Sequence, residues 1–155
     1  MKNSRVLVAS LALSASTLVG IAVHEGYVSD AMIPVPGDVP TIGFGETSGV
    51  KMGDTTTPVR ALVRLLDSAE THADGVKKCL GEGAQLYPYE FNAYVSLTYN
   101  IGVGAFCRSS IPAKVKAEQY DEACKTILLY NRAGGKVLRG LTVRREAEYR
   151  QCTGG

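Results

Sequence analysis

An uncharged run of eighteen residues near the N-terminus is the feature that most constrains how this chain can fold. The run extends from Val6 to Val23 and follows the basic residues Lys2 and Arg5. A helix that spans a bilayer needs roughly 20 apolar residues, and about 17 can suffice. Four hydroxyl residues and Gly20 make transfer of the run into lipid less favourable. The sequence therefore predicts a weak membrane segment, with a cytoplasmic N-terminus and the rest of the chain exported.

Three interpretations of this segment are open from the sequence. We favour an uncleaved signal anchor over residues 1–23, followed by one domain over residues 24–155. A cleaved secretory signal could use the small residues of Gly20-Ile21-Ala22. Cleavage there would leave Glu25 three residues from a new terminus, which is a poor place to fix a functional carboxylate. The third interpretation is an ordinary buried first helix of a cytosolic protein.

The residues after the run have the composition of a single domain. They number about 130, which is within the usual domain size and enough to bury a core. The formal net charge is only +2 and the basic residues are scattered along the sequence. This balance argues against a nucleic-acid partner, and it would tolerate an anionic cell-wall polymer.

Four cysteines lie beyond the run, which predicts two disulfides in an oxidising compartment. Of the three possible connectivities we favour Cys79 with Cys107 and Cys124 with Cys152, because the second pair would tie the final helix to the one before it. The spacing does not exclude the other two. The cysteines are far apart in sequence, as are the only histidines, so we expect no zinc site, no catalytic thiol and no cofactor.

Turn residues and apolar periodicity predict an α+β fold, mainly helical, with a small antiparallel sheet near its start. Prolines and glycines punctuate residues 31–50, which indicates short strands and turns. Thr57 and Pro58 supply an N-cap and a first-turn proline for a helix whose apolar stripe extends to Ala69. Further helices are expected over about 88–101, from 111, over 120–130 and over about 141–152, with a break at Gly134-Gly135.

Three polar residues near the apolar run suggest a chemistry. Glu25 follows the run at once, and Asp38 and Thr41 follow in the turn-rich stretch. A glycosidase uses one carboxyl group to protonate the leaving oxygen and a second group to orient water or stabilise the transition state. From spacing alone, a solvated Glu25 and an Asp38 chosen for a tight turn are the simpler explanations.

Several motifs then occur in order along residues 24–152. They are Glu25-Gly26, Thr41-Ile42-Gly43-Phe44-Gly45, the stretch 93–106 around Tyr-Asn-Ile-Gly, and the stretch 133–146 that ends in Arg-Arg-Glu. Together they resemble the phage-type lysozymes, or endolysins, of glycoside hydrolase family 24. With the weak N-terminal segment, the chain is most similar to the signal-arrest-release endolysins of that family.

The resemblance implies a lysozyme that hydrolyses the β-1,4 bond between N-acetylmuramic acid and N-acetylglucosamine in peptidoglycan and so lyses the host cell. Glu25 matches the general acid, and Thr41 matches the threonine that helps place the water. The family's aspartate usually lies nine residues after the glutamate and six before the threonine, but Pro34 and Val35 occupy those positions here. The family also implies inversion at the anomeric carbon. The alternative functions are a lytic transglycosylase and a non-catalytic, membrane-tethered wall-binding module.

Asp38 is our preferred second carboxylate because it shares a loop with Thr41, and Asp30 is the alternative. Asn100 ends an apolar helix, where its amide could reach the cleft or cap the helix. Three further residues fall near family positions that contact sugar: Thr47, Val103 and Ser109. Arg144 or Arg145 could pair with Glu25 or with wall carboxylates, and we expect at least one of them on a solvated helix face.

The N-terminal segment also suggests how activity is controlled. While residues 6–23 lie in the inner membrane, Glu25 would be held at the bilayer surface, away from Asp38 and Thr41. When the segment leaves the lipid, which the resemblance links to depolarisation, it could pack on the domain and carry Glu25 into the cleft. We therefore expect a monomer in the host inner membrane first and then in the periplasm, acting on peptidoglycan, with no metal and no nucleic-acid partner.

Overall fold

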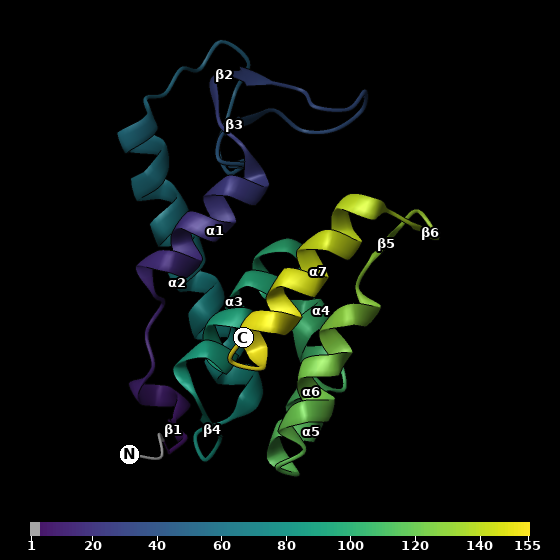
Figure 1. The fold of residues 1–155 in the computed structure, drawn as a ribbon. Coiled ribbons are helices and arrows are strands. Elements are labelled where there is room, and N and C mark those ends of the chain that lie inside the picture. The colour runs from purple at the N-terminus through teal and green to yellow at the C-terminus, as the bar shows by residue number, and fades with distance from the viewer. Residues whose placement is uncertain (1–3) are drawn as a thin grey trace.

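The computed structural model describes residues 4–155, which form the mainly helical α+β fold that the sequence predicts, with three two-stranded antiparallel sheets instead of the one expected near its start. Figure 1 shows the β2–β3 hairpin and its loops at one end of the molecule, beyond the end of α1 and the start of α2. The remaining helices form the larger body of the protein. The molecule therefore has a small hairpin region and a large helical region.

The uncharged run is divided among several elements. Its first part forms β1 (Val6–Leu7) and the short 3-10 helix η1 (Val8–Ser10), and its second part lies in α1 (Ala15–Glu25). Strand β1 pairs antiparallel with β4 (Gln85–Leu86). The Ser14 side chain caps α1 by accepting a hydrogen bond from the Thr17 N–H at 3.1 Å. Over residues 4–155, no helix has both the length and the apolar character needed to cross a bilayer.

Polar contacts attach this segment to α3 (Pro88–Ile101) and α7 (Arg139–Cys152). They are an Arg5–Glu90 ion pair at 2.8 Å, a Ser14 N–H to Asn92 Oδ1 bond at 2.8 Å, and a Gln151 Nε2 to Thr17 Oγ1 bond at 2.9 Å. Val8 and Ile21 are also buried in the core. The N-terminal segment is therefore an integral part of this fold.

The sheet predicted near residues 31–50 is the antiparallel hairpin of β2 (Val28–Met32) and β3 (Thr41–Gly43). Val28 pairs with Gly43 and Met32 pairs with Thr41, with an irregular register between them. The connecting residues 33–39 are all exposed. This hairpin therefore contributes little to the core.

The predicted helices are present, and most begin where the cap residues indicated. Helix α2 (Pro58–Leu80) has Thr57 as its N-cap and continues past Ala69, because further buried side chains extend its inner face. Three later elements are α5 (Ile111–Lys116), α6 (Tyr120–Thr126) and the 3-10 helix η2 (Ile127–Leu129). Several short elements were not predicted: the strands β1 and β4, the 3-10 helix η1, the helix α4 (Val103–Arg108), and the hairpin of β5 (Arg132–Ala133) and β6 (Lys136–Val137).

Helix α3 is the centre of the core. Its Phe91, Tyr94 and Leu97 side chains are fully buried. Two disulfides brace the helices around it: Cys79–Cys107 joins α2 to α4, and Cys124–Cys152 joins α6 to α7, with Cα–Cα distances of 5.2 and 5.7 Å. The preferred disulfide pairing is confirmed.

Candidate active site

A cavity of about 340 Å³ lies where α1 ends, between the loop after β3, helix α2 and the end of α3. Polar side chains from all four elements line it: Glu25, Glu46, Thr47, Arg64, His72, Tyr99 and Asn100. The volume is within the usual range of small-molecule sites, and a few polar groups converge on it. Several chemically active side chains from different elements therefore meet in this recess.

Glu25 is the last residue of α1, and Gly26 ends the helix with a φ of 70°. The Glu25 Oε1 atom accepts a hydrogen bond from Arg144 Nη1 at 3.0 Å. The Glu25 side chain is 22% exposed and that of Arg144 is 7% exposed. The helix end and the buried arginine together fix the direction of the carboxylate, which still reaches solvent in the cavity.

Gly45 lets the hairpin region come close to Glu25. A Cβ atom built on Gly45 would lie 2.9 Å from the Glu25 Oε2 atom, and its φ of +81° favours glycine. The last glycine of Thr-Ile-Gly-Phe-Gly therefore brings the loop backbone to the second oxygen of the acid.

Arg144 and Arg145 are both buried, at 6% and 0% exposure, so the expected solvated helix face is wrong. The cause is Glu148, one turn further along α7, which is 2% exposed and pairs with both arginines. Burial raises the pKa of Glu148, which the two arginines oppose, and burial lowers the pKa of Arg145. Arg145 Nη2 also donates to Asn100 Oδ1 at 3.0 Å, and Gly102 rather than Asn100 caps α3.

Several residues of the cavity were missed from the sequence. Glu46 pairs with Arg64 at 2.6 Å, and the His72 and Tyr99 rings lie 5.0 Å apart between centroids. Burial is the main cause of the raised pKa of Tyr99, and the negative charges of Glu25 and Glu46 raise this pKa further. The Glu-Thr that directly follows the glycine motif was a signal that could have pointed to Glu46.

The hairpin residues predicted as catalytic lie outside the cavity lining. Asp38 is exposed in the β2–β3 loop, and its Oδ1 accepts the Val39 N–H at 2.8 Å. Thr41 begins β3, and its hydroxyl donates to the Val39 carbonyl at 3.3 Å. Asp30 is exposed on β2 and accepts a hydrogen bond from the Ser29 hydroxyl. Of the three residues predicted as catalytic, only Glu25 lines this recess.

The predicted sugar-contacting residues also divide into two groups. Thr47 and Asn100 line the cavity. Val103 packs against Gly75 of α2, because a Cβ atom built on Gly75 would lie 2.6 Å from a methyl carbon of Val103. The Ser109 hydroxyl donates to the Phe106 carbonyl at 2.7 Å and closes a local turn.

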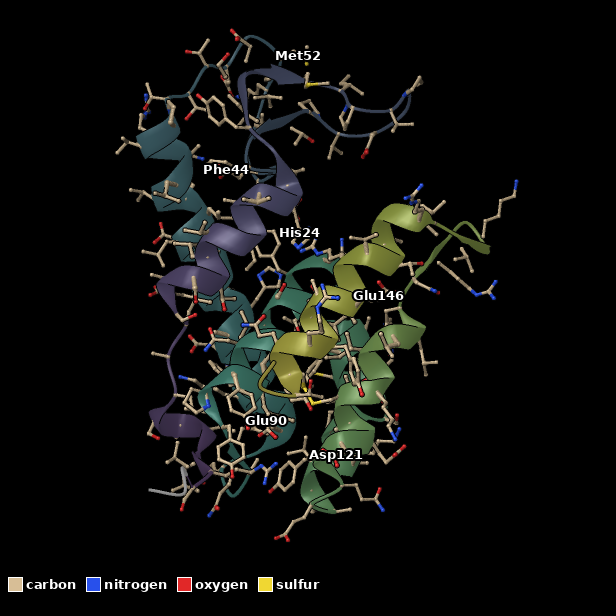
Figure 2. All side chains as sticks on the ribbon, in the orientation of Figure 1. His24, Phe44, Met52, Glu90, Asp121 and Glu146 are labelled. Atoms are coloured by element: carbon tan, nitrogen blue, oxygen red, sulfur yellow. A yellow bond between two sulfur atoms is a disulfide. The ribbon has the colours of Figure 1, made fainter. Side chains whose placement is uncertain are left out.

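Another recess is lined by residues of α1, α3 and α7. His24, Ser96 and Glu148 are among the residues that line it, and Figure 2 shows His24 between α1 and α7. Partial burial lowers the pKa of His24, the charges of Arg144 and Arg145 lower it further, and Glu25 opposes them. In residues 4–155, no cluster of three or more His, Cys, Asp or Glu side chains is placed to hold a metal ion.

Comparisons with known proteins agree with this architecture. A family model described as Phage lysozyme matches residues 22–148. The chain is 35% identical over 109 residues to the endolysin of Bacillus phage B103, covering 70% of this chain and 41% of that relative. It is 31% identical over 144 residues to the SAR-endolysin of Pseudomonas phage phiKMV, covering 89% of this chain and 86% of that relative. This chain thus spans about two fifths of the Bacillus phage relative and most of the Pseudomonas phage relative.

A solved structure has the same fold. The endolysin from Escherichia coli O157:H7 phage FAHEc1 superimposes with a TM-score of 0.81 at 29% sequence identity. The match covers 92% of this chain and 94% of that one.

Proposed function

We propose that this chain, which belongs to the phage lysozyme family, is an endolysin that acts as a muramidase. It would hydrolyse the β-1,4 bond between N-acetylmuramic acid and N-acetylglucosamine in peptidoglycan and so lyse the host cell. The observation that carries the proposal is the placement of Glu25 in the cavity. This carboxylate is half-buried, held by Arg144 at 3.0 Å, and open to a recess large enough for a sugar ring.

Glu25 is proposed as the general acid that protonates the glycosidic oxygen as the bond breaks. Asp38 and Thr41 are proposed to direct the attacking water, because they share the β2–β3 hairpin whose glycine motif approaches Glu25. Glu46 is a second candidate for the other carboxylate, because it lines the same cavity as Glu25. An inverting reaction would need about 6.5–9.5 Å between the two carboxyl groups, which leaves room for the water.

Thr47 and Asn100 are proposed to bind the sugar in the cavity. Val103 and Ser109 lie outside the cavity lining and are partly exposed, so we propose them as contacts for the parts of a glycan strand that extend past it. No step of this mechanism uses a metal or a cofactor.

The N-terminal segment is proposed to control the enzyme. Residues 1–23 would anchor the chain in the host inner membrane, and release into the periplasm would let the segment dock on residues 24–155 as a monomer. The docked contacts with Glu90, Asn92 and Gln151 support this idea, because Glu25 ends the same continuous segment. A segment held in lipid would leave Glu25 away from Arg144.

The function is tested by measuring hydrolysis of purified peptidoglycan. Replacing Glu25 with glutamine should lower the rate by about 10²–10⁴-fold, the usual contribution of a general acid. Glu146→Gln is the matched control, because Glu146 is exposed on α7. Full activity of Glu25→Gln would refute the proposed role. Mass spectrometry separates the alternatives: anhydro products would indicate a transglycosylase, and wall binding without cleavage would indicate a binding module.

The control mechanism needs its own experiment. Membrane-bound and released protein are compared for specific activity on the same wall preparation. The tethered form should be inactive. Equal specific activity in both forms would contradict control by the N-terminal segment.

A further inference from the structure

We propose that Glu148 is a positioning residue for Glu25 and acts through Arg144. This inference rests on the proposed function, in which Glu25 is the general acid. Arg144 contacts a carboxylate on each of two edges: its Nε lies 3.3 Å from Glu148 Oε1, and its Nη1 lies 3.0 Å from Glu25 Oε1. Because the guanidinium is planar and rigid, fixing its inner edge also fixes the direction of its outer edge.

Glu148 is itself fixed in position by contacts with two other residues. Its Oε1 accepts a hydrogen bond from the Ser96 hydroxyl of α3 at 2.8 Å, and its Oε2 pairs with Arg145 Nε at 2.9 Å. Glu148 is 2% exposed and Ser96 is 5% exposed. Through Glu148, the Ser96 hydroxyl therefore fixes the orientation of Arg144 relative to α3, the central helix of the core, as well as relative to α7.

Glu148 also balances the charge beside the acid. Arg144 and Arg145 are adjacent and buried, and the other side-chain partner of Arg145 is the neutral amide of Asn100. The other titratable groups near Glu25 are its neighbour His24 on α1 and the side chains that share its cavity: Glu46, Arg64, His72 and Tyr99. Without Glu148, Arg145 would lose the carboxylate it pairs with, and Glu25 would be left as the carboxylate paired with Arg144. Arg144 would then no longer have one preferred orientation.

A purely structural role for Glu148 makes a different prediction. A buried ion cluster that serves only the fold would lower the melting temperature when broken, yet leave the turnover of the folded molecules unchanged. A positioning role lowers kcat in molecules that are fully folded, because a small misplacement of a catalytic group is costly. The two roles are therefore separated by kinetics measured well below the melting temperature.

The test compares Glu148→Gln with Glu146→Gln, a carboxylate on the same helix that is exposed in the structure (Figure 2). Glutamine keeps the shape and can still accept from Ser96, but it removes the charge. We expect kcat on peptidoglycan to fall by roughly 10–100-fold in Glu148→Gln with KM unchanged, and neither to change in the control. Glu148→Asp, which keeps the charge, should recover part of the loss. An unchanged kcat in folded Glu148→Gln would overturn the proposal.

A second measurement does not depend on activity. The Arg144 side-chain N–H groups are followed by NMR hydrogen exchange in the wild-type protein and both variants. Exchange at Nη1, which faces Glu25, should become faster in Glu148→Gln and stay unchanged in Glu146→Gln. Unchanged exchange at Nη1 would refute positioning. Inactive wild-type protein would refute the proposed function instead, while the exchange comparison still tests the Glu148 contact.

If Glu148→Gln does not fold, Ser96→Ala takes its place, because it removes only the hydroxyl that donates to Glu148. A smaller loss of kcat and a smaller increase in Nη1 exchange are then expected. No change in either measurement would count against the proposal.

Discussion

The two sides of the candidate site are built in different ways. On the helical side, Arg144 pairs with Glu148 within α7 and with Glu25 at the end of α1, and the contact with Glu25 joins residues 119 apart in sequence. On the hairpin side, the side-chain hydrogen bonds found for Asp38 and Thr41 within residues 4–155 go to the backbone of the neighbouring Val39. One side is thus fixed by a charge cluster that is largely buried and links two distant elements, and the other by local turn geometry. Substitutions on the helical side should cost both stability and activity, whereas those on the hairpin should cost activity alone.

The largest effect is expected for Arg144→Gln. Removing this guanidinium leaves the Glu148 carboxylate buried with one partner fewer and Glu25 without its partner, and breaking a buried pair usually costs about 3–5 kcal/mol. Arg64→Gln is the control, because the Arg64–Glu46 pair is much more exposed and should contribute at most about 1 kcal/mol. Urea unfolding measures both. Equal losses of unfolding free energy in Arg144→Gln and Arg64→Gln would contradict a special stabilising role for the buried pairs of the helical side.

Asp38→Asn should show the opposite behaviour. The free energy of unfolding should change by no more than about 0.5 kcal/mol, as for other surface positions. Peptidoglycan hydrolysis should fall by about 100-fold or more if Asp38 assists the water. Asp30→Asn, on the adjacent strand, should keep its activity. If Asp38→Asn stays active and Glu46→Gln does not, Glu46 is the second carboxylate.

Gly45→Ala tests the place where the two sides meet. The added Cβ would lie 2.9 Å from Glu25 Oε2, so Glu25 must shift, and activity should fall by up to about 100-fold. Gly49→Ala is the matched control: its φ is +70°, and nothing lies within 4 Å of the added atom. Both variants should lose similar stability from backbone strain, so the difference in hydrolysis rate isolates the contact. Equal hydrolysis rates in Gly45→Ala and Gly49→Ala would contradict a functional role for the close approach of Gly45 to Glu25.

The smallest effect concerns pH and His24. Burial, then Arg144 and Arg145, lower the pKa of His24 in the folded protein. The unfolded chain therefore binds this proton more readily, and the stabilising effect of neutral His24 is present above about pH 6.5 and is lost as the pH falls below it. His24→Gln should make unfolding free energy less dependent on pH between about 7.5 and 5. An unchanged dependence would contradict this assignment.

How much could be predicted from the sequence depended on whether a feature is local. Helix α3 has the predicted bounds because Pro88 and Gly102 mark its ends by their own backbone preferences. Helix α4 has only six residues, too few for a periodic apolar pattern. Arg144 and Arg145 were misjudged because their burial depends on Glu148 and on contacts to α3, which spacing within one helix does not reveal.

The β1–β4 pairing has a consequence for the length of the N-terminal run. Residues 6 and 7 are fixed by β4 at one end, and Glu25 is fixed by Arg144 at the other. One residue inserted into α1 would turn Glu25 by about 100° around the helix axis. The folded domain therefore sets the number of residues between these two points, and a longer run would turn Glu25 away from Arg144.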